Sequence, residues 1–231
     1  MAKVLYSTGW LLWRAKWRFL EALLIPFAIM LTIWWTWAAV ADDISAIVGW
    51  LFYALLAISF CIIAMVTHRL VILGPDGVPK LGIRMWGMRE TRFVSVFFAL
   101  YGGFYLLISL ISLVYEGKGV SALAILGIFS LILVFGYGYI FARLSVLFPS
   151  IAIGNRIDVK KAWNMTDGNS FPLFILVIIL PWIQDKVYDW IISLQPPVWI
   201  SYVTYFFGLV LFVAEVIILS YSYKALKEIN E

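Results

Sequence analysis

Six long stretches of apolar residues, separated by short polar connections, dominate the chain. They cover residues 20–41, 46–67, 93–115, 121–148, 171–194 and 199–223. A helix needs about 20 mostly apolar residues to cross the hydrocarbon core of a bilayer. The pattern therefore predicts an all-α integral membrane protein with six transmembrane helices in a single membrane domain, residues 1–231. The fifth stretch is interrupted by Pro181 and by Gln184-Asp185-Lys186, which predicts a kinked or short span.

Two connections contain amphipathic segments. Residues 10–19 place Trp residues on one helical face and Arg14 and Arg18 on another, which is typical of a helix lying among lipid headgroups. Residues 158–166 begin with Asp158, a residue type that caps helix N-termini, so they predict a second short interfacial helix.

The connection over residues 69–92 contains the turn sequence Gly74-Pro75-Asp76-Gly77. Apolar residues stand on both sides of this turn, at 70–73 and at 81–86. The pattern favours a small hairpin in which these two segments pair.

The composition agrees with a membrane protein. Apolar residues make up 64% of the chain and charged residues 13%, and the mean hydropathy is +0.99. Soluble domains are roughly 45–50% apolar and about 25% charged. These values exclude a soluble enzyme, a nucleic-acid-binding module and a disordered regulator, so no nucleic-acid partner is expected despite the net charge of +4.

The basic residues mark one side of the predicted membrane domain. The N-terminal segment, the two even-numbered connections and the C-terminal segment hold fifteen of the seventeen Lys and Arg residues. Lys118 and Lys186 are the exceptions. Cytoplasmic connections carry such an excess of positive charge, so both termini are predicted to be cytoplasmic. The expected location is the inner membrane of a bacterium.

An internal similarity links the second and fourth spans. Arg69-Leu-Val-Ile-Leu-Gly-Pro and Arg143-Leu-Ser-Val-Leu-Phe-Pro share a pattern, offset by 74 residues (143 − 69). Trp-x-Met follows each, at Trp86 and at Trp163. The spacing fits three two-helix pseudo-repeats of about 77 residues. Shared membrane-helix composition is the alternative explanation.

A family resemblance lies in the same region. The chain reads Y-I-F-A-R-L-S-V-L-F-P over residues 139–149 and K-K-A-W-N-M-T-D-G-N-S-F-P-L-F over residues 160–174. This resembles a set of bacterial multi-span proteins related to the membrane domain of glycerophosphodiester phosphodiesterases. In that family an Arg and a Pro stand at the end of one helix. A Trp-x-x-Thr-x-Gly element follows and leads into the next helix. The resemblance implies a fold and no catalytic residues, because the phosphodiesterase chemistry belongs to a separate soluble domain.

Glu215 is the most unusual polar residue, because it stands well inside the sixth span. An intramembrane carboxylate is costly and faces the interior of a bundle. Thr204, Gly208 and Ser222 share its helical stripe, which predicts an inward polar face. Two interpretations stay open. Glu215 is either a proton, cation or headgroup site, or it makes a structural bond to Arg143, His68 or a tyrosine.

The other polar residues of the spans have simpler interpretations. Glu21 lies one turn from Arg18, which favours a local salt bridge. Arg143 either extends to lipid phosphates or pairs with Glu215. Contacts with anionic headgroups are predicted for a set of basic residues and the single histidine: Arg14, Arg18, His68, Arg69, Lys160 and Lys161.

Small residues recur at helical spacing and predict close helix packing. They lie on the third span (Ser95, Ala99 and Gly103), the fourth (Gly138 and Ala142) and the sixth (Gly208). Most are expected to pack within the bundle, and the others to contact another membrane protein.

The sequence carries no phosphate-binding loop and no catalytic motif of the common hydrolase or metalloprotease types. With one His and one Cys it supplies no set of metal ligands, so neither a metal nor a cofactor is expected. The first hypothesis is a non-enzymatic accessory or scaffold subunit that contacts other membrane proteins and lipids. A small transporter or channel with a Glu215 site is the second hypothesis, and a lipid-binding or lipid-handling protein is the third.

Overall fold

The computed structural model describes residues 2–40, 45–79, 86–115, 120–155, 158–195 and 197–230. Six helical stretches in these ranges are long and apolar enough to cross a membrane. They confirm the prediction of a six-span, all-α, multi-pass membrane protein. No β-strand occurs in the described ranges.

The spans follow the predicted order, with some extended or composite helices. The elements are α1 (Ala2–Val40), α2 (Ala46–Leu73), the 3₁₀ turn η1 (Pro75–Gly77), α3 (Met88–Tyr115), α4 (Val120–Leu144), α5 (Leu147–Ala152), α6 (Val159–Met165), α7 (Ser170–Phe174), the π-helical turn η2 (Ile175–Ile179), α8 (Leu180–Ser193) and α9 (Val198–Asn230).

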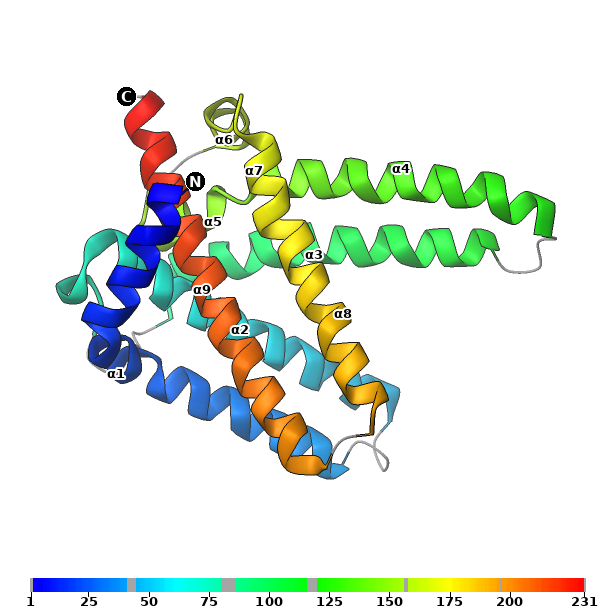
Figure 1. The fold of residues 1–231 in the computed structure, drawn as a ribbon, viewed down its shortest axis with the longest axis horizontal. Coiled ribbons are helices and arrows are strands. Elements are labelled where there is room, and N and C mark those ends of the chain that lie inside the picture. The colour runs from blue at the N-terminus through cyan, green and yellow to red at the C-terminus, as the bar shows by residue number, and fades with distance from the viewer. Residues whose placement is uncertain are drawn as a thin grey trace.

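The helices are joined at one end and diverge at the other (Figure 1). α1 and α2 run together, and α9 packs against both. α3 and α4 lie side by side as a second hairpin, which points away from α8 and α9 in Figure 1. The continuous stretch from α7 to α8 bridges these groups, because α7 packs on α4 and α8 packs on α9.

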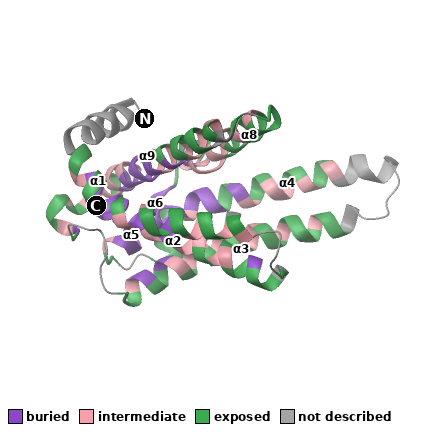
Figure 2. Ribbon diagram, turned by 90° about the horizontal axis from the view of Figure 1, so that it is seen from below, coloured by how far each residue is buried: buried purple, intermediate pink, exposed green. Residues whose placement is uncertain are grey.

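The buried residues form two clusters, with α2 and α9 contributing to both. One cluster contains residues of α1, such as Leu23 and Met30. The other contains Phe93 of α3 and residues of α4, α5, α6, α7 and η2. Figure 2 shows the buried positions around α5, α6 and the inner half of α4. The outer lengths of the helices are less buried, although aromatic side chains of α1, α2, α8 and α9 contact one another there.

α3 is the most exposed of the spans. None of the residues in its most apolar 18-residue window is buried, compared with 44% of the corresponding window in the span from α4 to α5. Whatever covers α3 in the membrane therefore lies outside the described part of this chain.

Pro181 does not shorten the fifth span, which was predicted to be kinked or short. The helix continues from Ser170 to Ser193, and a π-helical turn over Ile175–Ile179 comes directly before the proline. Proline has no N–H, and its ring collides with the carbonyl four residues earlier in a regular α-helix. The wider turn is a known adjustment inside helices, and here it lets the span continue past Pro181.

The connections correct one prediction and match another. Residues 70–73 continue α2 as helix, so the predicted hairpin is wrong for its first strand; residues 80–85 lie outside the described ranges. The short helix expected near 158–166 is α6. The Asp158 carboxylate accepts a 2.6 Å hydrogen bond from the backbone N–H of Lys161, and Gly168 ends the segment with a φ of 71°.

Candidate functional site

Arg69 lies at the end of α2, where it joins three helices. Its Nε donates to the carbonyl of Ala152 at 2.7 Å, and a terminal nitrogen donates to Glu90 Oε1 at 2.7 Å. The other Glu90 oxygen accepts the backbone N–H of Gly87 at 3.0 Å, at the start of α3. Arg69 is only 4% exposed. This burial corrects the expectation of a headgroup contact, because Arg69 instead ties α2, α3 and α5 together.

Arg143 has a similar position at the end of α4. Its Nε donates to Thr166 Oγ1 at 3.1 Å, and a terminal nitrogen donates to the carbonyl of Trp163. The guanidinium carbon lies 4.1 Å from the centre of the Trp163 ring, a cation–π contact. Asp167 Oδ1 is 3.4 Å away. Arg143 is buried, so it is bound to α6 and its C-terminal turn rather than to lipid phosphate or Glu215.

The two arginines have equivalent acidic partners. Glu90 and Asp167 are 77 residues apart, as are Trp86 and Trp163 (163 − 86). Each acid lies four residues after its tryptophan. This shared offset is the signal in the sequence that could have identified Glu90. Each arginine thus pairs with an acid at the position that a two-unit repeat would predict.

His68 and Arg18 also have partners within the protein. His68 Nδ1 lies 2.7 Å from Ser220 Oγ of α9, and the side chain is 1% exposed, which excludes the predicted headgroup contact. Arg18 donates to Glu21 at 3.2 Å and to the carbonyls of Pro75 and Val78. Glu21 thus makes the local salt bridge expected from its spacing.

Only two of the predicted headgroup residues are fully exposed in the part of the chain with described side chains. Lys160 and Lys161 lie on α6, beside a shallow groove that also includes Asn164 and Asn230. The side chain of Arg14 lies outside the described residues.

The predicted packing residues fall into two groups. A side chain on Gly138 would meet Phe174 at 3.1 Å, and Ala142 is completely buried. The Gly208 carbonyl accepts from Gln184 at 3.3 Å, and Gly103 faces the Tyr137 hydroxyl. Ser95 and Ala99 differ, because both are exposed.

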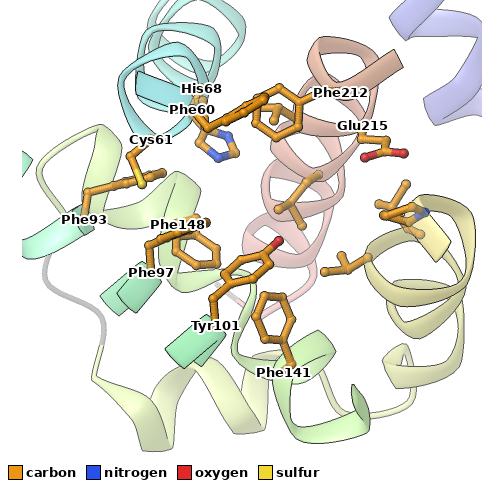
Figure 3. Close-up of a pocket in the computed structure, with 16 residues that line it drawn as sticks. Phe60, Cys61, His68, Phe93, Phe97, Tyr101, Phe141, Phe148, Phe212 and Glu215 are labelled. Atoms are coloured by element: carbon orange, nitrogen blue, oxygen red, sulfur yellow. The ribbon is translucent and has the colours of Figure 1, made fainter. Parts of the chain in front are cut away.

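A cavity of about 160 Å³ lies where the hairpins diverge. Residues of α2, α3, α4, α5, η2, α8 and α9 line it, and most of them are apolar or aromatic. Its polar or titratable lining side chains are Glu215, His68, Tyr101 and Cys61. Figure 3 shows the Tyr101 hydroxyl pointing into this space, with Glu215 on the α9 side.

Glu215 is half-buried, and its Oε1 is buried without a hydrogen-bond partner. The sequence suggested that Glu215 bonds to Arg143 or His68. Neither residue bonds to Glu215 Oε1, because Arg143 is bound to α6 and His68 Nδ1 faces Ser220. The other members of the predicted stripe, Thr204, Gly208 and Ser222, are half-buried as well. Among the described residues no group of three or more His, Cys, Asp or Glu side chains is placed to hold a metal ion.

Comparisons with protein-family models, with curated proteins and with solved structures find no match to this chain. The resemblance to the phosphodiesterase-associated membrane domains therefore stays a prediction. The structure adds that Arg143, Trp163 and Thr166, three residues of the quoted motif, contact one another.

Proposed function

We propose that the protein is a non-enzymatic accessory or scaffold subunit of a bacterial inner membrane, and that it holds another membrane protein through α3. The supporting observation is the exposure of this helix. Ser95, Ala99 and Gly102 are exposed at successive turns, and a side chain placed on Gly102 would meet no atom within 4 Å.

Such a surface suits a partner helix better than lipid alone. Small side chains allow two helix backbones to approach closely, and this close packing drives association inside a membrane. The span from Phe93 to Tyr115 contains no Asp, Glu, Lys or Arg. The proposed contact therefore depends on shape and not on charge.

A photo-crosslinking amino acid placed at residue 99 tests the proposal, with residue 28 as the matched control. Ala28 is likewise an exposed alanine in a spanning helix, but it lies on α1. In cells that carry the native partner, residue 99 should give a protein crosslink and residue 28 only lipid adducts. Ala99→Leu should reduce co-purification of the crosslinked protein in mild detergent, and Ala28→Leu should not.

A monodisperse protein with lipid adducts alone at both positions would contradict the proposal. Equal loss of folded yield in both leucine variants would also contradict it, because the substitution would then act on the fold and not on a contact.

A second candidate function is a small transporter, and it is favoured by the cavity that reaches Glu215. Arg143 takes no part in that cavity, so the site would depend on Glu215. Glu215→Gln should then abolish flux at unchanged folded yield. The lipid-handling hypothesis is weakened, because Arg69 and Arg143 are buried. Of the predicted headgroup residues with described side chains, only Lys160 and Lys161 are exposed.

A further inference from the structure

The central cavity brings one carboxylate without a partner together with a nearly continuous wall of aromatic rings. Phe97 stacks on Tyr101 with ring centres 4.2 Å apart, and Tyr101 meets Phe141 edge-on at 4.9 Å. Phe148 continues the wall, 6.4 Å from Phe141 and 5.2 Å from Phe93. Helices α3, α4 and α5 together supply these rings.

The α9 side of the cavity carries the opposing groups. Phe212 meets Phe60 of α2 edge-on at 5.1 Å. Glu215 lies one turn further along α9, and its Oε1 is buried without a donor. In Figure 3 the Glu215 carboxylate lies on the side of α9 that faces the η2–α8 stretch, and Tyr101 lies on the other side with the remaining rings; all of these residues line the cavity. A ligand in the cavity would therefore touch both the carboxylate and the aromatic faces.

These groups select the charge of a ligand. No Lys or Arg occurs among the lining residues that the structure describes, so an anion would meet the carboxylate without compensation. A neutral apolar ligand would leave a buried carboxylate unpaired, which is costly in a membrane. A cation satisfies the carboxylate and is also attracted by the faces of the aromatic rings.

The same groups select an organic cation over a metal ion. Calcium takes six to eight oxygen ligands, and magnesium requires an octahedral set of them. Here a single carboxylate stands in an apolar lining. Ammonium groups with methyl or ethyl substituents need no such shell, because their surface is apolar and their charge is spread over it.

The volume limits the size of the ligand. An apolar cavity of about 150 Å³ holds one benzene molecule. This cavity has a volume of about 160 Å³ and is partly open, so it suits a trimethylammonium group or one aromatic ring inside it, with the rest of the ligand at its opening.

We propose that this cavity binds a small lipophilic ammonium ion, with Glu215 as its counter-ion and the rings of Tyr101, Phe97 and Phe141 as its cation–π surface. The proposal rests on other residues than the contact proposed for α3, because none of Ser95, Ala99 and Gly102 lines the cavity. It concerns binding alone and requires no chemical step.

The test uses two probes that differ only in charge. Phenyltrimethylammonium and tert-butylbenzene have nearly the same shape, but only the first is a cation. The full-length protein in nanodiscs of zwitterionic lipid is titrated with each probe by calorimetry. The cation should bind at least tenfold more tightly than the neutral probe, after subtraction of partitioning into empty nanodiscs.

Matched variants assign the binding to the cavity. Glu215→Gln should weaken binding of the cation at least tenfold, and Glu21→Gln should not change it. Glu21 is a suitable control because the substitution removes the same charge from an exposed carboxylate on α1. Tyr101→Leu should weaken the cation about threefold to tenfold and leave the neutral probe unchanged. If Glu215→Gln does not fold, the Tyr101→Leu variant alone tests whether the cation binds in the cavity.

Three results would overturn the proposal. They are no saturable binding of the cation by the wild-type protein, equal affinity for the cation and the neutral probe, and an unchanged affinity in a folded Glu215→Gln or Tyr101→Leu variant. Since none of these measurements involves a partner protein, failure here would not bear on the accessory-subunit proposal.

Discussion

Replacing Arg69 with methionine removes a buried guanidinium and keeps much of its apolar stem. The structure allows the effect to be estimated, because both partners of the ion pair are nearly inaccessible: the side chains of Arg69 and Glu90 are 5% and 10% exposed. Removal of one partner from a buried pair costs about 3–5 kcal/mol, since the other charge is left without compensation. The Ala152 carbonyl also loses its donor. Arg69→Met should therefore destabilise the protein by about 3–5 kcal/mol.

The second ion pair of the repeat is the internal comparison. Arg143 and Asp167 are 3.4 Å apart, and the Asp167 side chain is 84% exposed. An interaction with such an exposed carboxylate contributes about 0–1 kcal/mol. Asp167→Asn should therefore change the stability by less than about 1 kcal/mol, although it removes the acid at the equivalent position of the repeat.

Unfolding by a denaturing detergent in mixed micelles measures both effects, and the 12 tryptophans provide the fluorescence signal. The double variant Arg69→Met/Glu90→Met should recover much of the lost stability, because an apolar pair often replaces a buried ion pair without net cost. A loss in Arg69→Met no larger than that in Asp167→Asn would refute the reasoning. So would a double variant less stable than Arg69→Met alone.

Three further predictions concern packing, capping and a buried hydrogen bond. Gly138→Ala should lower the stability by about 1–3 kcal/mol through overpacking. Gly136→Ala should not lower it, because a side chain there meets no atom within 4 Å. Unfolding in the same denaturing detergent compares the two variants. Asp158→Ala should remove about 1 kcal/mol of capping, seen as faster amide exchange in α6 at unchanged exchange elsewhere. Ser220→Ala should lower the stability by about 1–3 kcal/mol, because the buried His68 Nδ1 loses its hydrogen-bond partner. Thermal unfolding in detergent should then show a lower midpoint. An unchanged midpoint would contradict a stabilising His68–Ser220 hydrogen bond.

The spans could be predicted because their signal is local. A run of apolar residues is sufficient to identify a helix that can cross a bilayer, and Asp158 caps a helix through an N–H only three residues away. The hairpin prediction failed for a related reason. Apolar residues 70–73 are compatible with strand or helix, and the continuing helix α2 includes them.

The partners of the buried polar residues could not be predicted in the same way. His68 and Ser220 are 152 residues apart in the sequence, and Arg69 and Ala152 are 83 residues apart. Such contacts depend on how the hairpins pack, which helical periodicity does not specify. The position of Glu215 inside a span did indicate an inward carboxylate. The aromatic wall opposite it is assembled from three other helices, and no local pattern could reveal it.

The position of α3 links the two proposals. The hydrogen bonds of Arg69, Glu90 and Gly87 fix the start of α3 to α2 and α5, while its outer length has no buried residue in its most apolar window. That outer length packs along α4, and inside a bilayer no hydrophobic force draws it toward the remaining helices. One side of α3 presents Ala99 to the surroundings, and the same helix supplies Phe93, Phe97 and Tyr101 to the cavity. A partner helix that changed the tilt of α3 would therefore change the cavity, and a ligand that moved Tyr101 would change the surface around Ala99. Coupling between two binding sites is reciprocal. If the partner changes the affinity for an ammonium ion by some factor, the ammonium ion should change the affinity for the partner by the same factor.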